Sequence, residues 1–171
     1  MKAEEYLLVK AKIKRELDNI SILESELHRY GLFPKITSDS IGKFSLDEPA
    51  ACRIIGSILH DYYVAVENIF KAIARRIDGS LLDGEFWHKE LLEQMTLEIT
   101  GIRPPVITSK TFVFLDELRG FRHVFRHVYG FSLSHERIIE LLKTLPEVSS
   151  LLKKDLDTFM KKAEEMLFNH S

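Results

Sequence analysis

The chain has 171 residues, of which 45% are hydrophobic and 29% are charged, and its formal net charge is −2. This length predicts one domain with its own core, and the near-neutral charge excludes binding of nucleic acid through a globally basic surface. The single cysteine, Cys52, excludes an intramolecular disulfide and a cysteine-based zinc site. There is no signal-peptide pattern and no apolar run approaching ~18 residues, so we expect a cytoplasmic protein that does not enter a membrane.

The first half of the chain is predicted to form two long helices. Apolar residues recur at steps of three and four over residues 2–30, and a glycine follows in the position of a helix C-cap. Residues 32–46 contain Pro, Gly, Ser and Thr and are typical of a loop. Asp47 and Pro49 are typical of an N-cap and a first-turn proline, and the helix that they begin extends to about residue 78.

The second half predicts further helices and no clear strand, because no segment alternates with a period of two. Proline disrupts a helix interior, so Pro146 is expected to interrupt the last segment. The predicted helical segments are 85–96, 109–129, and a final one from residue 134 that resumes after Pro146 over 151–167. We therefore predict an all-α, up-and-down helical bundle of about five to six helices, with residues 1–171 as one domain and 146–171 as a C-terminal helical extension.

The helix predicted over residues 109–129 has two distinct faces. At about 100° per residue, its apolar side chains gather in an arc of roughly 120° and its polar side chains in an opposite arc of roughly 160°. The polar arc is therefore expected to point away from the core. The apolar arc holds Phe114, Leu118, Phe121, Val124, Phe125 and Val128, and the polar arc holds Arg119, Arg122, His123, Arg126, His127 and Tyr129.

A polar helix face is most often simply solvated, but such faces usually mix Lys with Glu. This arc contains neither residue type. Arginine binds phosphate with a fixed fork of donors, and imidazole transfers protons near neutral pH, so the pattern indicates metal-free chemistry on a phosphodiester. Arg122 would stabilise a phosphorane, and His127 would serve as base or acid. The remaining candidates for binding phosphate are Arg119, His123 and Arg126.

A metal site is a rival interpretation of the same helix. His123 and His127 are four residues apart, which is a spacing for metal ligands. No Glu lies between them in a His-Glu-x-x-His arrangement, and the neighbouring arginines would repel a cation. A di-iron bundle needs two Glu-x-x-His motifs, whereas this chain has one, from Glu85 to His88. No metal or other cofactor is therefore expected, and the other histidines are interpreted as surface or packing residues: His28, His60, His88, His135 and His170.

Arg122, His127 and Tyr129 match the Arg-x4-His-x-Tyr signature of HepT-type toxins, so the chain resembles these members of the wider HEPN superfamily of all-helical ribonucleases and nucleotide-binding domains. His123 fits the superfamily's tendency to place a polar residue directly after the arginine. The order of the helices also agrees over roughly residues 1–145, with a late motif helix followed by a C-terminal helix. The long second helix of this arrangement bears Tyr62, Tyr63 and Glu67.

The resemblance implies a metal-independent endoribonuclease toxin that acts on RNA as a homodimer, with two motif helices facing across one basic cleft. It also implies a partner, a minimal nucleotidyltransferase antitoxin of the MntA type, which would silence the toxin by AMPylation of Tyr129. Within one straight helix Arg122 and His127 lie about 140° apart, which independently favours a site completed by two subunits. AMP on Tyr129 would place an anion against the arginines and fill the phosphate site.

Two other functions are compatible with the same residues. A non-catalytic HEPN domain could use the arginine face to bind nucleotides or substrates for a partner nucleotidyltransferase. A helical interaction protein would instead bury this face against another protein. Replacement of Arg122 and His127 distinguishes these functions, because only a toxin would lose the ability to arrest growth.

Overall fold

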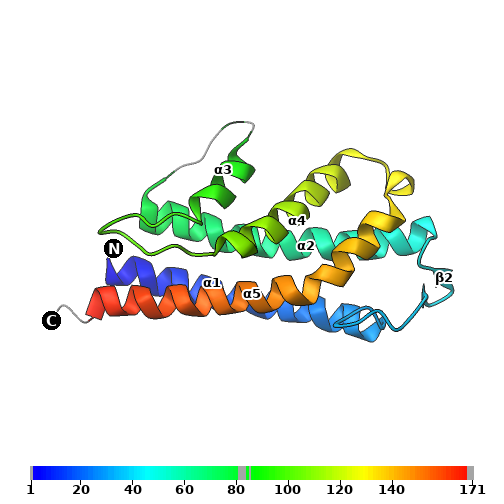
Figure 1. Cartoon of the computed structure of the whole chain (residues 1–171), viewed down its shortest axis with the longest axis horizontal. Coiled ribbons are helices and arrows are strands. Elements are labelled where there is room, and N and C mark those ends of the chain that lie inside the picture. The colour runs from blue at the N-terminus through cyan, green and yellow to red at the C-terminus, as the bar shows by residue number, and fades with distance from the viewer. Residues whose placement is uncertain (1, 81–83, 85, 169–171) are drawn as a thin grey trace.

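The computed structural model describes residues 2–80, 84 and 86–168, and these residues form the predicted all-α bundle (Figure 1). Glu85 and His170, which entered the sequence predictions, lie outside the described residues. In chain order the elements are α1 (Ala3–Arg29), β1 (Ser40–Ile41), β2 (Phe44–Ser45), α2 (Pro49–Ile73), η1 (Ala74–Asp78), α3 (Trp87–Gln94), α4 (Ser109–His127), η2 (Gly130–Ser132) and α5 (His135–Phe168).

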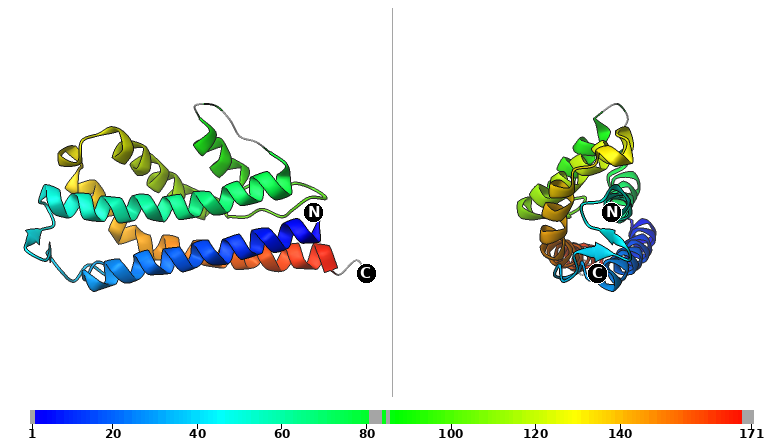
Figure 2. Two further views of the ribbon diagram at one scale, coloured as in Figure 1. Left: turned by 180° about the vertical axis from the view of Figure 1, so that it is seen from behind. Right: turned by 90° about the vertical axis from the view of Figure 1, so that its right-hand side faces the viewer.

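The long helices run up and down along one axis, which confirms the predicted architecture. In Figure 1, α1, α2 and α5 extend along the length of the molecule, and both termini lie at the same end. The views in Figure 2 show α4 and α3 on the side of α2 that faces away from α1. As a result α2 is the central helix of the bundle, and it contacts α1, α3, α4 and α5.

The core follows from the apolar periodicity of the sequence. In α1 the buried apolar side chains recur every three to seven residues along one face, at Tyr6, Val9, Ile13, Ile20 and Leu27. In α2 fourteen residues are buried because neighbours cover the helix on several sides. Each fully buried large apolar side chain contributes roughly 1.5–3 kcal/mol, so α2 is a firmly held platform for the polar groups on its surface.

The predicted ends of several elements shift by a few residues. α2 begins at Pro49 as predicted, but its N-cap residue is Glu48 rather than Asp47, and the Glu48 carboxylate accepts a hydrogen bond from the Ser45 backbone N–H at 2.9 Å. The predicted loop over residues 32–46 contains the short antiparallel pair β1–β2. These differences are local and leave the order of the helices unchanged.

The start of α4 is tied to α5 by a buried carboxylate. Thr108 is the N-cap residue of α4. Asp155 on α5 accepts hydrogen bonds from the Thr108 backbone N–H at 2.8 Å and from the Thr111 hydroxyl at 2.5 Å. An acidic group beside a helix N-terminus also stabilises the helix dipole, so this contact fixes where α4 leaves the bundle.

The predicted interruption at Pro146 is wrong, because α5 is one continuous helix with Pro146 inside it. A proline within a helix costs about 3 kcal/mol, since it lacks the N–H donor and its ring crowds the preceding turn. The buried side chains of Leu142, Leu145 and Val148 flank it on both sides and outweigh this cost by packing into the core. Figure 1 shows α5 bending in its N-terminal part, as expected for a helix that accommodates a proline.

The predicted end of the motif helix is also wrong, because α4 ends at His127 rather than at Tyr129. Val128 is extended, with φ −112° and ψ 155°. The chain then turns through η2 onto α2, where the side chain of Arg53 packs so closely on Gly130 that any side chain at position 130 would collide with it. Tyr129 therefore does not belong to the polar face of α4.

A buried ion pair holds the connection between α3 and α4 against the end of η1. Arg103 is 1% exposed, and its Nε and Nη2 donate hydrogen bonds to the two carboxylate oxygens of Asp78 at 2.6 and 2.9 Å. It also donates to the backbone carbonyls of Gln94 and Leu97 at 3.1 and 2.9 Å. Because Gln94 is the last residue of α3, this ion pair fixes the position of α3 relative to α2.

We predict that Arg103→Met lowers the free energy of unfolding by about 3–5 kcal/mol, because it leaves the Asp78 carboxylate buried without its cationic partner. Urea unfolding followed by circular dichroism measures this loss. Lys161→Ala is the control, because it removes an exposed i,i+4 pair with Asp157 and should cost no more than about 0.5 kcal/mol. Equal losses in the two variants would contradict the assigned role of Arg103.

Candidate functional site

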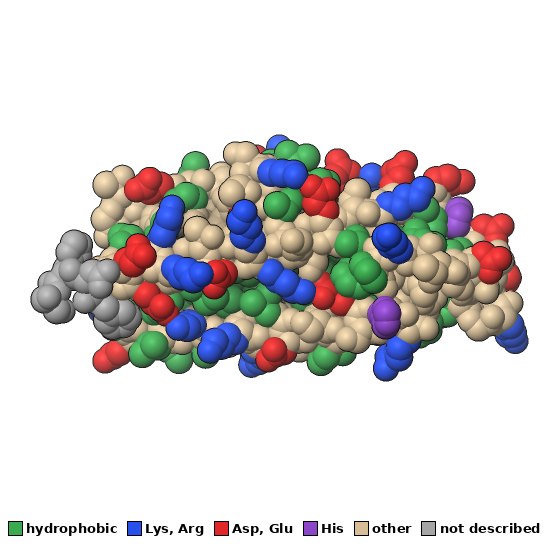
Figure 3. Space-filling view, turned by 60° about the horizontal axis from the view of Figure 1, so that its bottom comes forward, with side chains coloured by type: hydrophobic (Ala, Val, Ile, Leu, Met, Phe, Trp, Pro, Cys, Tyr) green, Lys and Arg blue, Asp and Glu red, His purple; other side chains and the backbone are tan. Residues whose placement is uncertain are grey.

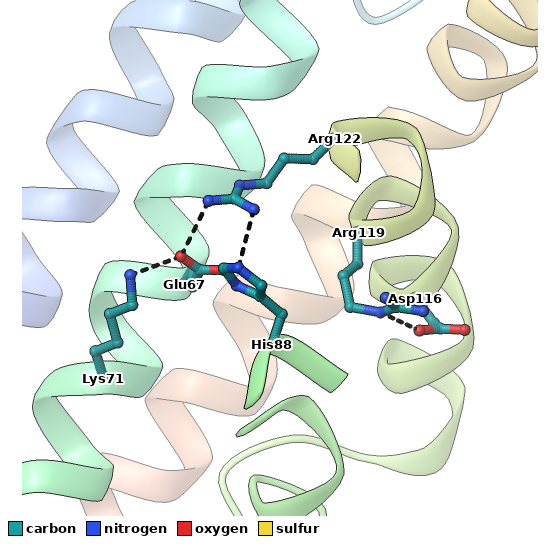
Figure 4. Close-up of polar contacts among 6 residues, drawn as sticks. All are labelled: Glu67, Lys71, His88, Asp116, Arg119 and Arg122. Atoms are coloured by element: carbon teal, nitrogen blue, oxygen red, sulfur yellow. Dashed lines mark hydrogen bonds and ion pairs between the residues drawn. The ribbon is translucent and has the colours of Figure 1, made fainter. Parts of the chain in front are cut away.

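Arg122 points into the protein rather than away from it, which corrects the predicted orientation of the polar face of α4. Its side chain is 11% exposed. Its Nη2 lies 3.6 Å from Oε1 of Glu67 on α2, and its Nη1 lies 3.4 Å from Nε2 of His88 on α3 (Figure 4). Three elements that are distant in the sequence therefore meet at this guanidinium.

The inward position of Arg122 follows from a close crossing of α4 over α2. Gly56 has no side chain, and a Cβ at this position would lie 2.9 Å from Cε2 of Phe125. The Phe125 ring also stacks on His60, with the ring centroids 5.2 Å apart. Because Arg122 precedes Phe125 by almost one turn and the helices are antiparallel, its side chain extends along α2 toward Glu67.

Glu67 is the buried centre of the cluster, with 1% of its surface exposed. Its Oε1 lies 2.7 Å from Nζ of Lys71, and its Oε2 lies 2.5 Å from Nδ1 of His88. Together with Arg122, these groups surround one carboxylate on three sides, as Figure 4 shows. A buried charge is tolerated when it is paired and hydrogen-bonded, so Glu67 dictates the positions of its three partners.

His88 was interpreted from the sequence as a surface or packing residue, and the structure corrects this interpretation. Trp87 covers its ring, with the centroids 3.6 Å apart, and Lys71 lies over the Trp87 ring at 4.4 Å. Burial lowers the pKa of His88 below its usual range, and the charges of Arg122 and Lys71 lower it further, whereas Glu67 opposes the shift. This lowered pKa favours the neutral form of His88 at pH 7.

His123 and His127 form a second group at the exposed end of α4. Their rings are 4.4 Å apart, and Nδ1 of His127 donates a hydrogen bond to the His123 carbonyl at 2.6 Å. This contact leaves Nε2 of His127 directed away from the helix backbone and able to accept a proton. No hydrogen bond among the described residues joins His127 to Arg122. The two predicted catalytic side chains are therefore not in contact within one protomer.

The other predicted site residues occupy the rim. Arg119 is half-buried and donates from Nε to Asp116 at 2.7 Å, so the one acidic residue on this face partly offsets its charge. Arg126 is exposed beside the two histidines. Tyr129 lies beyond the end of α4 and is 77% exposed, so its phenol is accessible to an external enzyme.

Neither a metal centre nor a membrane segment is found in the part of the chain that the structure describes. No three His, Cys, Asp or Glu side chains of these residues are grouped so that they could hold a metal ion. None of the described helices combines the length and the hydropathy that are needed to cross a bilayer.

One comparison with known proteins gave a match. The family model described as HepT-like protein matches residues 54–163, which include most of α2, the whole of α3 and α4, and most of α5. No curated protein and no solved structure matches the chain. The matched segment contains Glu67, His88, Arg122 and His127, and it confirms the resemblance that the motif indicated.

We predict that Glu67→Gln lowers the free energy of unfolding by about 3 kcal/mol, because Arg122 and Lys71 are left close together without a carboxylate between them. Glu93→Gln is the matched control, since Glu93 is an exposed residue of α3 whose pair with Lys89 spans 3.7 Å. Urea unfolding of both variants tests the difference. A loss for Glu67→Gln no larger than that of the control would show that the cluster is not held by this carboxylate.

Proposed function

The chain belongs to the HepT-like protein family, and on this premise we propose that it is the metal-independent endoribonuclease toxin of a toxin–antitoxin pair. The observation that carries the proposal is the guanidinium of Arg122. It is held at the edge of the cluster by Glu67 and His88 at distances of 3.6 and 3.4 Å. Both contacts are long for hydrogen bonds, so N–H donors of Nη1 and Nη2 are available for a phosphate, whereas Nε is buried in the protein.

Cleavage of RNA by internal transesterification needs little more than these groups. The 2′-hydroxyl oxygen attacks the adjacent phosphorus, the bond to the 5′-oxygen breaks, and the products are a 2′,3′-cyclic phosphate and a free 5′-hydroxyl. Arg122 stabilises the charge on the pentacoordinate phosphorane, as a preorganised bidentate donor can. His127 presents an imidazole nitrogen that can exchange a proton with the reacting oxygens.

A homodimer would bring the separated groups together. An apolar stripe that is interrupted by the exposed Glu117 lies along α4, with Val113 59% and Val124 46% exposed. Gly120 lies between them, and a Cβ at this position would meet no atom within 4 Å. An exposed stripe on the motif helix with room beside its glycine can pack against the same stripe of a second copy. In such a pair His127 of the partner subunit could face Arg122 across the cleft.

A basic groove beside the cluster offers a path for the RNA backbone. The groove, with a volume of about 550 Å³, lies between α1 and α2 and is lined by Lys12, Arg15, Lys71, Arg75 and Arg76. Lys71 also contacts Glu67, so the groove adjoins the cluster directly. By contrast, basic and acidic side chains alternate over α5 and α1 in Figure 3. Four of these five cations also pair with Glu5, Glu16 or Glu67, so an RNA phosphate would bind here in competition with these carboxylates.

The proposed regulation is AMPylation of Tyr129 by a minimal nucleotidyltransferase antitoxin of the MntA type. The phenol is exposed immediately after the exposed pair His123 and His127. A bound AMP carries a phosphate that would compete with RNA for the nearby arginines and would obstruct His127. This position explains how modification of a residue outside the helix could still silence the site.

We predict that induction of the wild-type protein arrests growth and produces new RNA ends on a denaturing gel. Arg122→Ala and His127→Ala should each lower cleavage by at least about 10²-fold, because each removes charge stabilisation or proton transfer. Lys154→Ala, an exposed change on α5, should remain toxic. Intact RNA and normal growth with the wild type would instead favour a non-catalytic, nucleotide-binding partner of a nucleotidyltransferase.

We predict that Val124→Asp converts the dimer into a monomer that no longer cleaves RNA, since a charge in the apolar stripe opposes packing of two α4 helices. Light scattering reports the mass, and the RNA assay reports the activity. Ile22→Asp, a change of an even more exposed apolar residue on α1, should remain a dimer. A fully active Val124→Asp monomer would refute the need for two subunits.

We predict that the antitoxin and ATP add AMP to the wild-type protein and abolish cleavage. Tyr129→Phe should still cleave RNA but should gain no mass in the same reaction, because it lacks the acceptor oxygen. Intact-protein mass spectrometry and the RNA assay measure the two effects together. Full ribonuclease activity of quantitatively modified protein would contradict inhibition through Tyr129.

A further inference from the structure

The transesterification requires two proton transfers, and the sequence motif provides one clear imidazole for them. A base must take the proton of the 2′-hydroxyl, and an acid must give a proton to the departing 5′-oxygen. His127 lies at the exposed end of α4 and can exchange a proton with one of the two reacting oxygens. His88 is the histidine that directly contacts Arg122, the group that would hold the phosphate.

The contacts of His88 fix which nitrogen carries its proton. Nδ1 lies 2.5 Å from Oε2 of Glu67 and must be the donor, because a carboxylate accepts hydrogen bonds. Nε2 therefore carries the lone pair, and it faces Nη1 of Arg122 at 3.4 Å. The side chain of His88 is 23% exposed, and its Nε2 would exchange the long contact with Arg122 for the hydroxyl of a bound ligand.

We propose that His88, oriented by Glu67, is the general base of the reaction and that His127 is the general acid. In the cleavage step the 2′-hydroxyl proton passes to Nε2 of His88 while the 2′-oxygen bonds to phosphorus. The bond from phosphorus to the 5′-oxygen breaks, and His127, which enters this step as the imidazolium with a proton on Nε2, supplies that proton to this oxygen. Glu67 is a positioning residue, since it acts through His88 and Arg122. This assignment rests on the proposed ribonuclease function.

The surroundings of His88 suit a base that begins neutral and becomes charged. The groups facing it are Glu67 and Lys71 on α2 and Arg122 on α4, with Trp87 covering the ring. Burial and the two cations lower its pKa, so the neutral form is present at pH 7. When it gains a proton, the Glu67 carboxylate lies against Nδ1 and stabilises the imidazolium, as in other carboxylate–imidazole pairs.

The test compares His88→Asn with His127→Ala on two substrates. The asparagine amide keeps a donor for Glu67 but has no group that can accept a proton. On RNA both variants should lose at least about 10²-fold in kcat. On uridine 3′-(4-nitrophenyl phosphate) the leaving group needs no acid, so His127→Ala should recover most of the wild-type rate and His88→Asn should stay slow. The assignment would be overturned if His88→Asn recovered most of the wild-type rate on the nitrophenyl substrate. It would also be overturned if His88→Asn kept the wild-type kcat on RNA.

Two further measurements separate catalysis from a structural role. His88→Asn should bind single-stranded RNA and unfold thermally as the wild type does, and His28→Asn, on the surface of α1, should change no rate. In wild type, kcat/KM should fall on acidification below pH 6.5, because the base must be neutral and its pKa is lowered. This decrease of kcat/KM at acidic pH should disappear in His88→Asn. If the decrease persisted in this variant, His88 would not be the base.

Failure of this assignment is distinguishable from failure of the proposed function. If the wild type does not cleave RNA, the ribonuclease proposal fails and the base assignment fails with it. If the wild type cleaves RNA and His88→Asn retains its rate, the ribonuclease proposal stands and the base assignment alone is wrong. Nitrogen NMR of the resting protein provides a reading independent of activity, since it should show the tautomer protonated at Nδ1 of His88.

Discussion

The cluster depends on one constraint, which is that the buried carboxylate of Glu67 must be paired. Glu67 lies on the central helix α2, and its partners are Lys71 on the same helix, His88 on α3 and Arg122 on α4. An unpaired carboxylate at this depth would cost several kcal/mol, so the three side chains are drawn to one point. The buried pair of Asp78 and Arg103 keeps α3 in place for this contact.

The helices could be predicted because each carries a long apolar stripe that is independent of its neighbours. What could not be predicted were the points where packing overrides a local rule. Pro146 is disfavoured within a helix, but the buried leucines around it keep α5 continuous. Tyr129 continues the helical pattern, but the chain leaves α4 at Val128 because η2 packs against α2 next to Arg53.

The candidate site was only partly accessible from the sequence. The motif identified Arg122 and His127, since their residue types and spacing are local features. A helical wheel treats the helix in isolation, so it placed Arg122 facing outward, whereas the crossing at Gly56 directs it inward. His88 was missed because its partners lie 21 and 34 residues away in the sequence, and only the fold brings them together.

The central claim is that this cluster and the motif histidine form one RNA-cleaving centre that uses side chains alone. The most direct measurement is the chemical nature of the RNA ends that the purified wild-type protein produces in the presence of excess EDTA. We predict 2′,3′-cyclic phosphate and 5′-hydroxyl ends at an undiminished rate. Ends with 3′-hydroxyl and 5′-phosphate groups, or loss of cleavage with the chelator, would contradict it.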